Sequence, residues 1–370
     1  MSQLQAKDVI AFLEQIAPPG YAMPDDRIGL QLGRMDKPVR KVALALDAYP
    51  KQIAEAIQSG ADLLVTHHAL IFRPLTQIDT ATARGRAIAE VLRHDLTVYN
   101  AHTNLDIAEG GVNDVLAEIL ELTHVEVLDR MQSQRLRKLV VFVPESHHQS
   151  VLAAVCEAGA GHIGGYSHCT FNTLGTGTFL PEEGTHPFIG EPGQLERTAE
   201  VRLETIVPEP LVETVVQAML AAHPYEEVAY DLYPLDIMGD PIGIGRVGDL
   251  KGPMRLEKFA ETVRHKLQLE HLRFTGDPDA VVSRVAVLGG SGGRWVKHAL
   301  AKGAEVLVTS DCDHHTVAEA WQDGLAVVDA THAAMELPVL RRVQEQLLAK
   351  FGDALEVAVV RVPEDPFRWV

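Results

Sequence analysis

Five histidine and carboxylate residues, spread over three segments, are the residues of this sequence best suited to chemistry. His67 and His68 directly follow a buried run typical of a β-strand, and Asp106 follows the next such run. His332 and Glu336 follow a third run near the other end of the chain, four residues apart, so a helix would place them on one face. Mixed imidazole and carboxylate ligands suit zinc, manganese, iron or cobalt better than magnesium or calcium. We therefore expect a divalent-metal site.

Each of these residues also has a plainer interpretation. Neighbouring side chains of an extended chain point to opposite sides. His67 and His68 therefore bind two different metal ions, or one binds an ion while the other contacts a ligand of that ion, or neither binds an ion. Asp106 supplies an oxygen of the kind that bridges two cations, or it caps a helix. Pro338 prefers a first helical turn, which would start the helix near Glu336 and leave His332 in the turn before it. The metal interpretation rests on the five residues occurring together.

Further polar segments leave more than one interpretation open. Asp311–His315 ends another strand-like run and either extends the metal site, supports its ligands, contacts substrate or forms an ordinary polar loop. His314 from this segment and His102, which precedes Asp106, are our candidates for proton transfer. Gly110–Asp114 predicts a turn into a helix capped by Asn113 or Asp114, and we assign Asn113 no chemical role.

Two glycine-rich segments invite comparison with nucleotide-binding motifs. Gly289–Gly293 either cradles an anion on backbone N–H groups or makes a tight turn between a strand and a helix. Gly243–Gly248 fits G-x-G-x-x-G, but the residues that follow do not predict the helix that a dinucleotide site needs. The P-loop pattern is absent. The usual dinucleotide and P-loop interpretations therefore both fail.

The elements that must position these residues occur twice. Strand, helix and strand are predicted over residues 41–66 and again over 284–309, with Val42 corresponding to Val285 and Thr66 to Thr309, an offset of 243 in both cases. A third strand follows each unit, at residues 96–101 and 325–330. We infer an internal duplication into two similar, interlinked α/β lobes with parallel sheets. The candidate ligands then lie past the carboxyl ends of strands, where open α/β sheets form their sites.

The segment between the lobes has a different pattern. It predicts a strand at 139–143, a helix at 151–157, a loop region rich in Gly, His and Thr over 159–193, a strand at 200–206, a helix at 209–222 and a strand at 228–233. This order indicates an inserted α+β domain. We expect a first lobe over residues 1–125, the insert over 126–235 and the second lobe over 236–370.

Composition limits the class of protein. A chain of 370 residues, 46% of them hydrophobic, is long enough for two or three domains. Its formal charge of -18, from 33 basic and 51 acidic residues, argues against nucleic acid as a partner. The sequence has no apolar run long enough to span a membrane and no secretory leader, so we expect a cytoplasmic protein. Three cysteines without a C-x-x-C pattern predict neither a disulfide framework nor a thiolate zinc site.

Six motifs in order resemble the GTP cyclohydrolase 1 type 2 homologue family, also called Nif-three-like proteins. They are Asp25–Gly33, Val65–Phe72, Asn100–Asp106, Gly110–Asp114, Gly289–Gly292 and Asp329–Glu336. The sequence departs from the usual family pattern at Ala69, Ser310 and Thr331, none of which removes a ligand.

The resemblance implies a two-lobed α/β core with a dinuclear metal site. It implies His67, His68, Asp106, His332 and Glu336 as the ligands of two divalent ions per chain. It also implies a toroidal homohexamer, a trimer of dimers, and an insert similar to CutA-type ferredoxin-like domains, for which residues 223–227 are the matching motif.

Two functions fit these expectations. The first is a metal-dependent hydrolase of a nucleotide-like or phosphorylated small molecule, in the manner of a GTP cyclohydrolase. The second is a non-enzymatic protein that binds or delivers metal or acts as a regulatory scaffold. An open coordination position beside a pocket with convergent polar groups would favour the enzyme.

Overall fold

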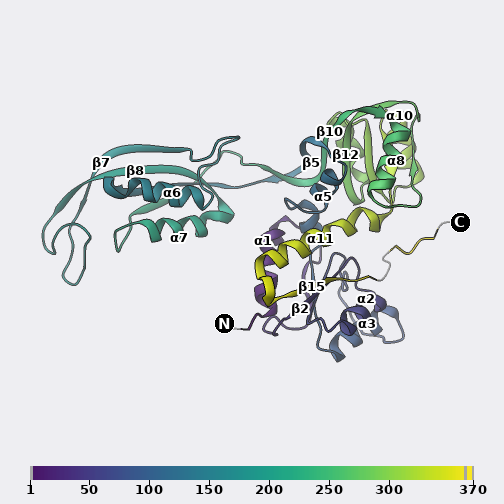
Figure 1. The fold of residues 1–370 in the computed structure, drawn as a ribbon, viewed down its shortest axis with the longest axis horizontal. Helices are drawn as coiled ribbons and strands as arrows, with labels where there is room; N and C mark the ends of the chain where they lie inside the picture. The colour runs from purple at the N-terminus through teal and green to yellow at the C-terminus, as the bar shows by residue number, and fades with distance from the viewer. Residues whose placement is uncertain (1–2, 362–364, 369–370) are drawn as a thin grey trace. The chain divides into compact units, whose positions relative to one another are not determined.

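The chain divides into two compact units, which are described separately. Unit 1 comprises Met1–Met131 and Ile242–Val370, and unit 2 comprises Gln132–Pro241. The structure is a computed structural model that describes residues 3–361 and 365–368 (Figure 1). Within these residues, no helix is both long and apolar enough to cross a membrane.

The first sheet of unit 1 is mostly parallel and contains strands from both ends of the chain. Its order is β1-β4-β3-β2-β15, with β1 antiparallel to β4 and the other pairs parallel. β3 is a continuous buried run, as expected of a parallel strand covered on both faces. The strands are β1 (Gly29–Leu32), β2 (Lys41–Ala45), β3 (Leu63–Thr66), β4 (Thr97–Asn100) and β15 (Glu356–Val359).

The second sheet of unit 1 has a parallel centre flanked by antiparallel strands. Its order is β11-β14-β13-β12-β10-β5; β12, β13 and β14 run parallel, while β11 and β10 pair antiparallel at either side. The strands are β5 (Thr123–Ser133), β10 (Pro241–Arg255), β11 (Arg273–Phe274), β12 (Val281–Ser291), β13 (Val306–Ser310) and β14 (Ala326–Asp329).

The parallel strands of the two sheets share one register. Val42 lies opposite Leu63 in the first sheet, and Val285 lies opposite Val306 in the second. The next pair of strands repeats this agreement, since Thr66 lies opposite Asn100 and Thr309 lies opposite Asp329. The agreement covers the body of the strands and ends at the carboxyl end of β12, where the register with β13 shifts between Val287 and Ser291.

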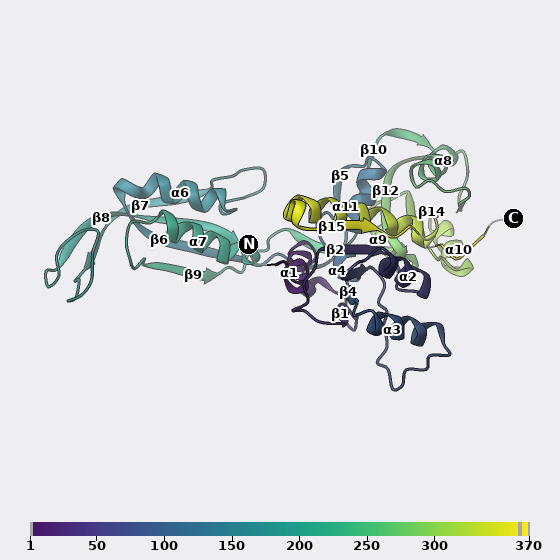
Figure 2. The ribbon, with the colours of Figure 1, turned by 60° about the horizontal axis from the view of Figure 1, so that its bottom comes forward.

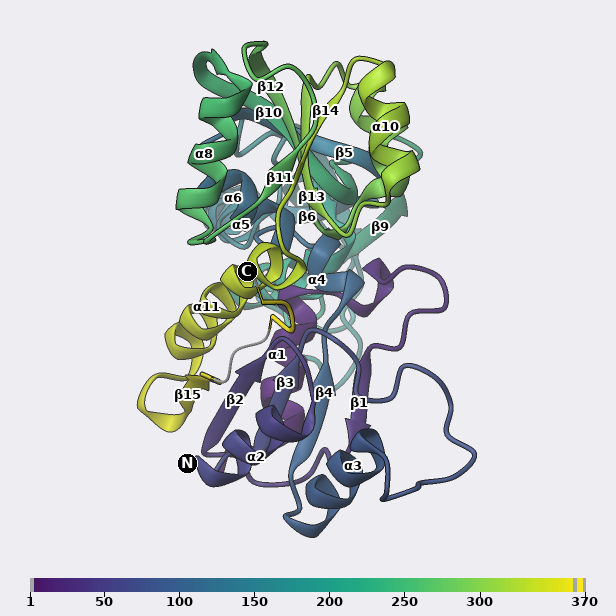
Figure 3. The same ribbon diagram turned by 90° about the vertical axis from the view of Figure 1, so that its right-hand side faces the viewer.

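Helices cover both faces of each sheet in unit 1. In the first sheet, α2 and α3 pack on one face and α1 on the other; in the second, α9 and α10 pack on one face and α8 and α11 on the other. The long helix α11 contacts β2 and β15 of one sheet and β12 and β13 of the other, and Figure 3 shows it with α4 between the sheets. The helices are α1 (Ala6–Ile16), α2 (Pro50–Gln58), α3 (Ala83–Arg93), α4 (Thr103–Ile107), α5 (Val112–Ile119), α8 (Leu256–Lys266), α9 (Val296–Ala301), α10 (His314–Gln322) and α11 (His332–Phe351).

Unit 2 is an α+β unit with a four-stranded antiparallel sheet. Its elements follow the order β-α-β-β-α-β of ferredoxin-like units, and the strand order is β7-β8-β6-β9. Both helices pack on one face of the sheet (Figures 1 and 2). The elements are β6 (Leu136–Pro144), α6 (His148–Glu157), β7 (Thr170–Phe179), β8 (Glu196–Pro208), α7 (Val212–Ala222) and β9 (Tyr230–Pro234).

Three local expectations were wrong. The segment 159–193 is not all loop, because β7 lies within it; this strand is mostly exposed and so lacks the alternation of apolar residues that marks a half-buried strand. Helix α11 begins at His332, with Pro338 in its interior, because packing of the long helix outweighs the roughly 3 kcal/mol cost of a helical proline. Helix α5 is capped at Gly111 instead of Asn113 or Asp114.

Candidate metal centre

The two adjacent histidines are held by backbone pairing that continues beyond β3. The N–H of His67 donates to the carbonyl oxygen of Ala45 at 3.2 Å, and the N–H of His68 donates to that of Leu46 at 2.8 Å. Both residues therefore extend the parallel ladder with β2. Their rings have different surroundings, since His67 is buried and the side chain of His68 is 26% exposed.

Four histidine rings are oriented by the same kind of contact. In each ring Nδ1 lies at hydrogen-bond distance from an oxygen that only accepts, so Nδ1–H is the donor and Nε2 is the nitrogen that would bind a metal ion once it is free of a proton. This is the arrangement by which proteins orient metal-binding imidazoles. The pairs are His67 with the carbonyl of Ala101 (3.0 Å), His68 with Asp47 (2.9 Å), His102 with Asp26 (2.8 Å) and His332 with Asp311 (2.6 Å).

The carboxylate of Glu336 lies between histidines from the two lobes. Its Oε2 is 3.1 Å from Nε2 of His68 and 3.1 Å from Nε2 of His332, and these two nitrogens are 3.3 Å apart. Its Oε1 is 3.7 Å from Nε2 of His67. On the other side of His67, Asp106 Oδ1 is 3.5 Å from the same Nε2. Ligand-type atoms from distant segments thus converge on one place.

The converging atoms form overlapping groups, each compact enough to surround an ion. The groups are His67 with Asp106 and Glu336, His68 with His332 and Glu336, and His67 with His68 and His102. Glu336 is shared by the first two groups.

The residues fit a bound cation because several of their buried atoms lack a hydrogen-bond partner. His67 Nε2, Asp106 Oδ1 and Glu336 Oε2 are inaccessible to solvent, and none of them makes an aligned hydrogen bond with a described residue, although Glu336 Oε2 lies 3.1 Å from the Nε2 atoms of His68 and His332. Burying such atoms without a partner costs free energy. A divalent ion would satisfy them together, and the donor set of imidazole nitrogens and carboxylate oxygens suits one.

The charges of the cluster influence one another strongly. Burial acts to lower the pKa of His68, but the adjacent carboxylates of Asp47 and Glu336 raise it to about 10. The contact with Glu336 likewise raises the pKa of His332 to about 9. Burial raises the pKa of Asp106, whereas the neighbouring histidines outweigh burial at Glu336 and hold the pKa of that carboxyl well below its usual range. Negatively charged carboxylates and positively charged imidazoles therefore stabilise each other in this cluster.

Gly290 leaves room for Glu336. A Cβ atom at position 290 would lie 2.5 Å from Glu336 Oε1, and the residue has φ +69°. Any side chain here would displace the carboxylate, and the backbone conformation also favours glycine. The glycines at the end of β12 thus serve the candidate centre by giving space to a ligand.

The structure brings together all five of the predicted ligands and adds His102 to them. His102, which we had proposed for proton transfer, has its ring centroid 5.2 Å from that of His67. His314, the other such candidate, is the first residue of α10 and is exposed; it belongs to none of the ligand groups and lines a separate cavity of about 150 Å³.

Sequence reasoning missed the residues that orient the rings. Asp26 lies in the first family-like motif and Asp47 lies just beyond β2, so each was visible as an acid in a notable place. The position of an acid within a motif or after a strand does not indicate which histidine it will contact. Asp311 lies in the Asp311–His315 segment, and supporting the metal ligands was only one of the four roles left open for that segment.

Comparison with known proteins decides the family. The model of the Duf34/NIF3 (NGG1p interacting factor 3) family matches residues 4–366. The chain belongs to this family. The resemblance seen in the sequence is thereby confirmed, and mixed α/β architecture with several sheets agrees with it.

Relatives and a solved structure match over 90% to 100% of the chain. The chain is 46% identical to a protein of Halalkalibacterium halodurans over 100% of both chains, and 48% identical to one of Bacillus subtilis over 90% of both; each of these is named a GTP cyclohydrolase 1 type 2 homolog. The crystal structure of a Bacillus cereus protein related to NIF3 is similar with a TM-score of 0.88 and 44% identity, covering 100% of both chains.

Proposed function

We propose that the chain is a metal-dependent hydrolase that binds two divalent ions and acts on a nucleotide-like or phosphorylated small molecule. The observation that carries the proposal is the position of Glu336, whose two oxygens face two different sets of histidines. A carboxylate in this position is suited to bridge two cations. His67, Asp106 and Glu336 would hold one ion, and His68, His332 and Glu336 the other, with His102 beside the first two histidines.

The two sets differ in exposure, which suggests a division of roles. His67, Asp106 and Glu336 are 1%, 7% and 3% exposed, so they would hold an ion firmly and out of reach of a large substrate. The side chains of His68 and His332 are 26% and 35% exposed, so substrate would approach from this side. Divalent ions, when bound, lower the pKa of water and stabilise developing negative charge.

The proposed substrate is a nucleotide-like or phosphorylated small molecule. The relatives are named for a GTP cyclohydrolase, and a reaction of that kind would hydrolyse the imidazole ring of the purine. The ligands define a metal centre without selecting GTP over other phosphorylated compounds. His102 is held by Asp26 and lies close enough to the centre to move a proton, whereas His314 would need a substrate that extends toward α10.

A non-enzymatic role in binding or delivering metal, or as a regulatory scaffold, is the second candidate. The burial of His67, Asp106 and Glu336 favours a role in binding metal or as a scaffold, because an ion held by these residues is shielded from substrate. Delivery of metal would in addition require a path by which the ion leaves. The two functions are distinguished by whether the protein turns over a substrate and whether that turnover is lost when a metal ligand is replaced.

The wider organisation also follows from the family resemblance. We propose that the two lobes arose by internal duplication, for which the shared strand register is the support, and that residues 126–235 form a CutA-like insert between lobes at 1–125 and 236–370. We further propose a cytoplasmic homohexamer built as a trimer of dimers.

The test combines metal analysis with turnover assays. Protein purified without added metal is analysed for its elements and then assayed on GTP and a panel of phosphoesters. For the unmodified chain we expect about two ions, as in other two-metal sites. For Asp106→Asn and Glu336→Gln we expect both the metal and the turnover to be lost. Glu345→Gln is the matched control, since Glu345 is an exposed residue of the same helix α11. Metal with no turnover on any substrate would support the binding protein, and full metal content in both ligand variants would refute the site.

A further inference from the structure

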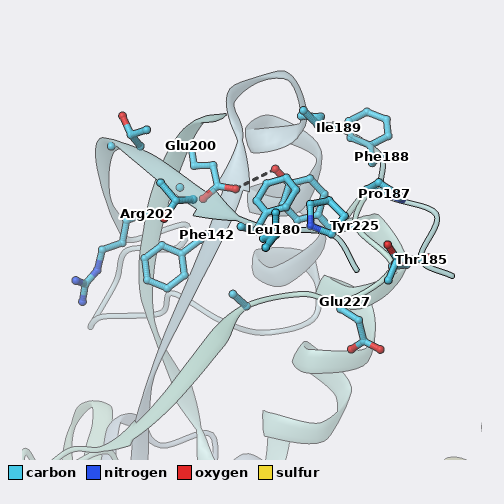
Figure 4. Close-up of a pocket in the computed structure, with 18 of the residues that line it drawn as sticks. Phe142, Leu180, Thr185, Pro187, Phe188, Ile189, Glu200, Arg202, Tyr225 and Glu227 are labelled. Atoms are coloured by element: carbon cyan, nitrogen blue, oxygen red, sulfur yellow. Dashed lines mark hydrogen bonds between the residues drawn. The ribbon is translucent and has the colours of Figure 1, made fainter. Parts of the chain in front are cut away.

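A second candidate site lies in unit 2, entirely among residues of the ferredoxin-like sheet and its loops. A cavity of about 730 Å³ is lined by β7, by the 180–189 segment and by residues of β6 and β8 (Figure 4). Leu203 of β8 packs in the core beneath α6 and α7, so Glu200 and Arg202, which alternate with it, lie on the helix-free face. A cavity of this volume is within the range of small-molecule sites.

The motif His223–Glu227, to which the metal centre gives no role, builds one wall of this cavity. The backbone N–H of Tyr225 donates to His223 Nδ1 at 3.1 Å, so the ring proton is on Nε2, which donates to the carbonyl of Phe142 at 3.0 Å. Glu226 accepts the backbone N–H of His186 at 3.1 Å and thereby holds the loop above the sheet. The motif thus connects the sheet floor to the covering loop.

Aromatic rings line much of the space. The ring centroid of Tyr225 is 5.8 Å from that of Phe179 and 6.3 Å from that of Phe188, and Phe142 lies on the floor beside them. Aromatic faces of this kind stabilise both apolar groups and cations. The lining therefore favours a ligand with an apolar body.

A buried carboxylate faces the same cavity. Glu200 is 7% exposed, and its Oε1 accepts a hydrogen bond from the hydroxyl of Tyr225 at 2.9 Å. Within residues 3–361 and 365–368 it forms no ion pair; the nearest arginine along the strand, Arg202, is paired with Glu204 at 2.8 Å. A buried carboxylate is costly without a cationic partner, so Glu200 is a place for a ligand's positive charge.

Two glycines in β7 keep space open around this carboxylate. Gly175 lies opposite Glu200 in the β7–β8 ladder, and a Cβ atom there would meet nothing within 4 Å. A Cβ atom at Gly177 would lie 2.1 Å from Glu200 Oε2. Glycine inside a strand weakens the strand and marks places where a ligand or another group must approach closely. Here the glycines admit the carboxylate and leave room beside it.

We propose that this cavity binds an organic cation, a primary ammonium carried on an apolar body. The ammonium group donates to Glu200, and the body lies against Phe179, Phe188 and Tyr225. The charge of the surrounding residues agrees, because Glu182, Glu226 and Glu227 also line the cavity while Arg202 is the one basic residue among its described lining. This binding is independent of the function proposed for the metal centre.

The test uses three probes on the full chain that share a phenylethyl body and differ in the charge of the head group. Binding of 2-phenylethylammonium, 2-phenylethanol and 3-phenylpropionate is measured by calorimetry and by saturation-transfer NMR. We expect the ammonium compound to bind more tightly than the alcohol, and the carboxylate to bind least. No binding of the ammonium compound, or equal or tighter binding of either other probe, would overturn the proposal.

Variants locate the charge that is recognised. Glu200→Gln keeps an oxygen to accept from Tyr225 but removes the charge, and we expect the affinity for the ammonium compound to fall about tenfold or more, as for loss of a hydrogen bond between charged groups. Glu213→Gln is the matched control, since Glu213 is an exposed residue of α7, which packs on the opposite face of the sheet. Equal affinity in the two variants would refute the role of Glu200. Should Glu200→Gln fail to fold, the three-probe comparison on the unmodified chain still decides the proposal.

Discussion

Asp311 Oδ2 lies 2.6 Å from Nδ1 of His332, at the end of the strand that corresponds to the one carrying His67 and His68. Asp311 has a positive φ of 55°, a conformation in which Asp and Asn are among the tolerated residues. The loop after β13 is thus shaped so that its first acid holds a ring of the candidate centre.

Asp311→Asn should weaken metal binding without removing a ligand. The amide still contacts His332 but carries no charge, so the imidazole becomes less basic and less firmly oriented. We expect metal affinity to fall about 10- to 100-fold, as for other residues that orient ligands. Competition with a chelator of known affinity measures the change, and Asp323→Asn, an exposed acid at the end of α10, is the control. Unchanged affinity in Asp311→Asn would show that the contact has no effect on the centre.

His102 and His314 should differ when each is replaced by alanine. His102 belongs to a ligand group and is held by Asp26, so His102→Ala should lower metal content or affinity. His314 is exposed at the start of α10, so His314→Ala should keep the metal content of the unmodified chain. Elemental analysis of both variants checks this. Loss of metal in His314→Ala, or full retention in His102→Ala, would contradict the arrangement described here.

Removal of metal should destabilise unit 1. Without an ion, buried atoms of His67, Asp106 and Glu336 make no aligned hydrogen bond to any residue that the structure describes. An ion present at 100 times its dissociation constant stabilises the native state by about 2.7 kcal/mol, so a chelator should lower the unfolding temperature. Calorimetry with and without chelator measures the shift. Glu336→Gln should show a smaller shift, and a chelator that leaves the unmodified chain unaffected would argue against a bound ion.

Asn113→Ala should destabilise the junction between the lobes even in metal-free protein. Asn113 is fully buried; its Nδ2 donates to the carbonyl of Asp106 at 2.9 Å, and its Oδ1 accepts the N–H of Gly289 at 2.9 Å. Each group left unpaired costs about 1–3 kcal/mol. Unfolding of metal-free protein by denaturant tests this, with the exposed Asn172→Ala as control. Equal stability of the two variants would mean that other groups or water replace these bonds.

Unit 2 should lose stability at mildly acidic pH because of His223. Burial lowers the pKa of His223 below its ordinary value of 6.5, although the contact with the carbonyl of Phe142 and the charge of Glu200 act in the opposite direction and His147 acts to lower it. The folded state therefore prefers the neutral ring. This contribution to stability is complete above pH 6.5 and is lost as the pH falls through the lower pKa of the folded state.

Hydrogen exchange of residues 132–241 between about pH 8 and pH 5 follows this loss across the range in which histidine titrates. His223→Gln, which cannot gain a proton, should show a weaker dependence on pH in this range. The same pH dependence in both proteins would assign the effect to other groups.

Local pattern was sufficient for much of the fold. The parallel strands of both lobes are short, buried apolar runs, and the helices between them carry apolar residues at helical spacing, so both could be predicted from neighbouring residues alone. The five candidate ligands could be placed at the carboxyl ends of these strands for the same reason. The six ordered motifs identified the family, which the family match confirmed.

Long-range packing determines the rest. The 159–193 segment was misjudged because β7 is stabilised by pairing with β8 while most of its side chains are exposed, and pairing leaves no mark in a local pattern. The start of α11 at His332 depends on contacts with strands of both sheets. The assignment of Asp26, Asp47 and Asp311 to particular rings, and the space that Gly290 leaves for Glu336, require segments up to hundreds of residues apart to meet. Such contacts are a property of the folded chain, because spacing along a sequence does not specify distance across a protein.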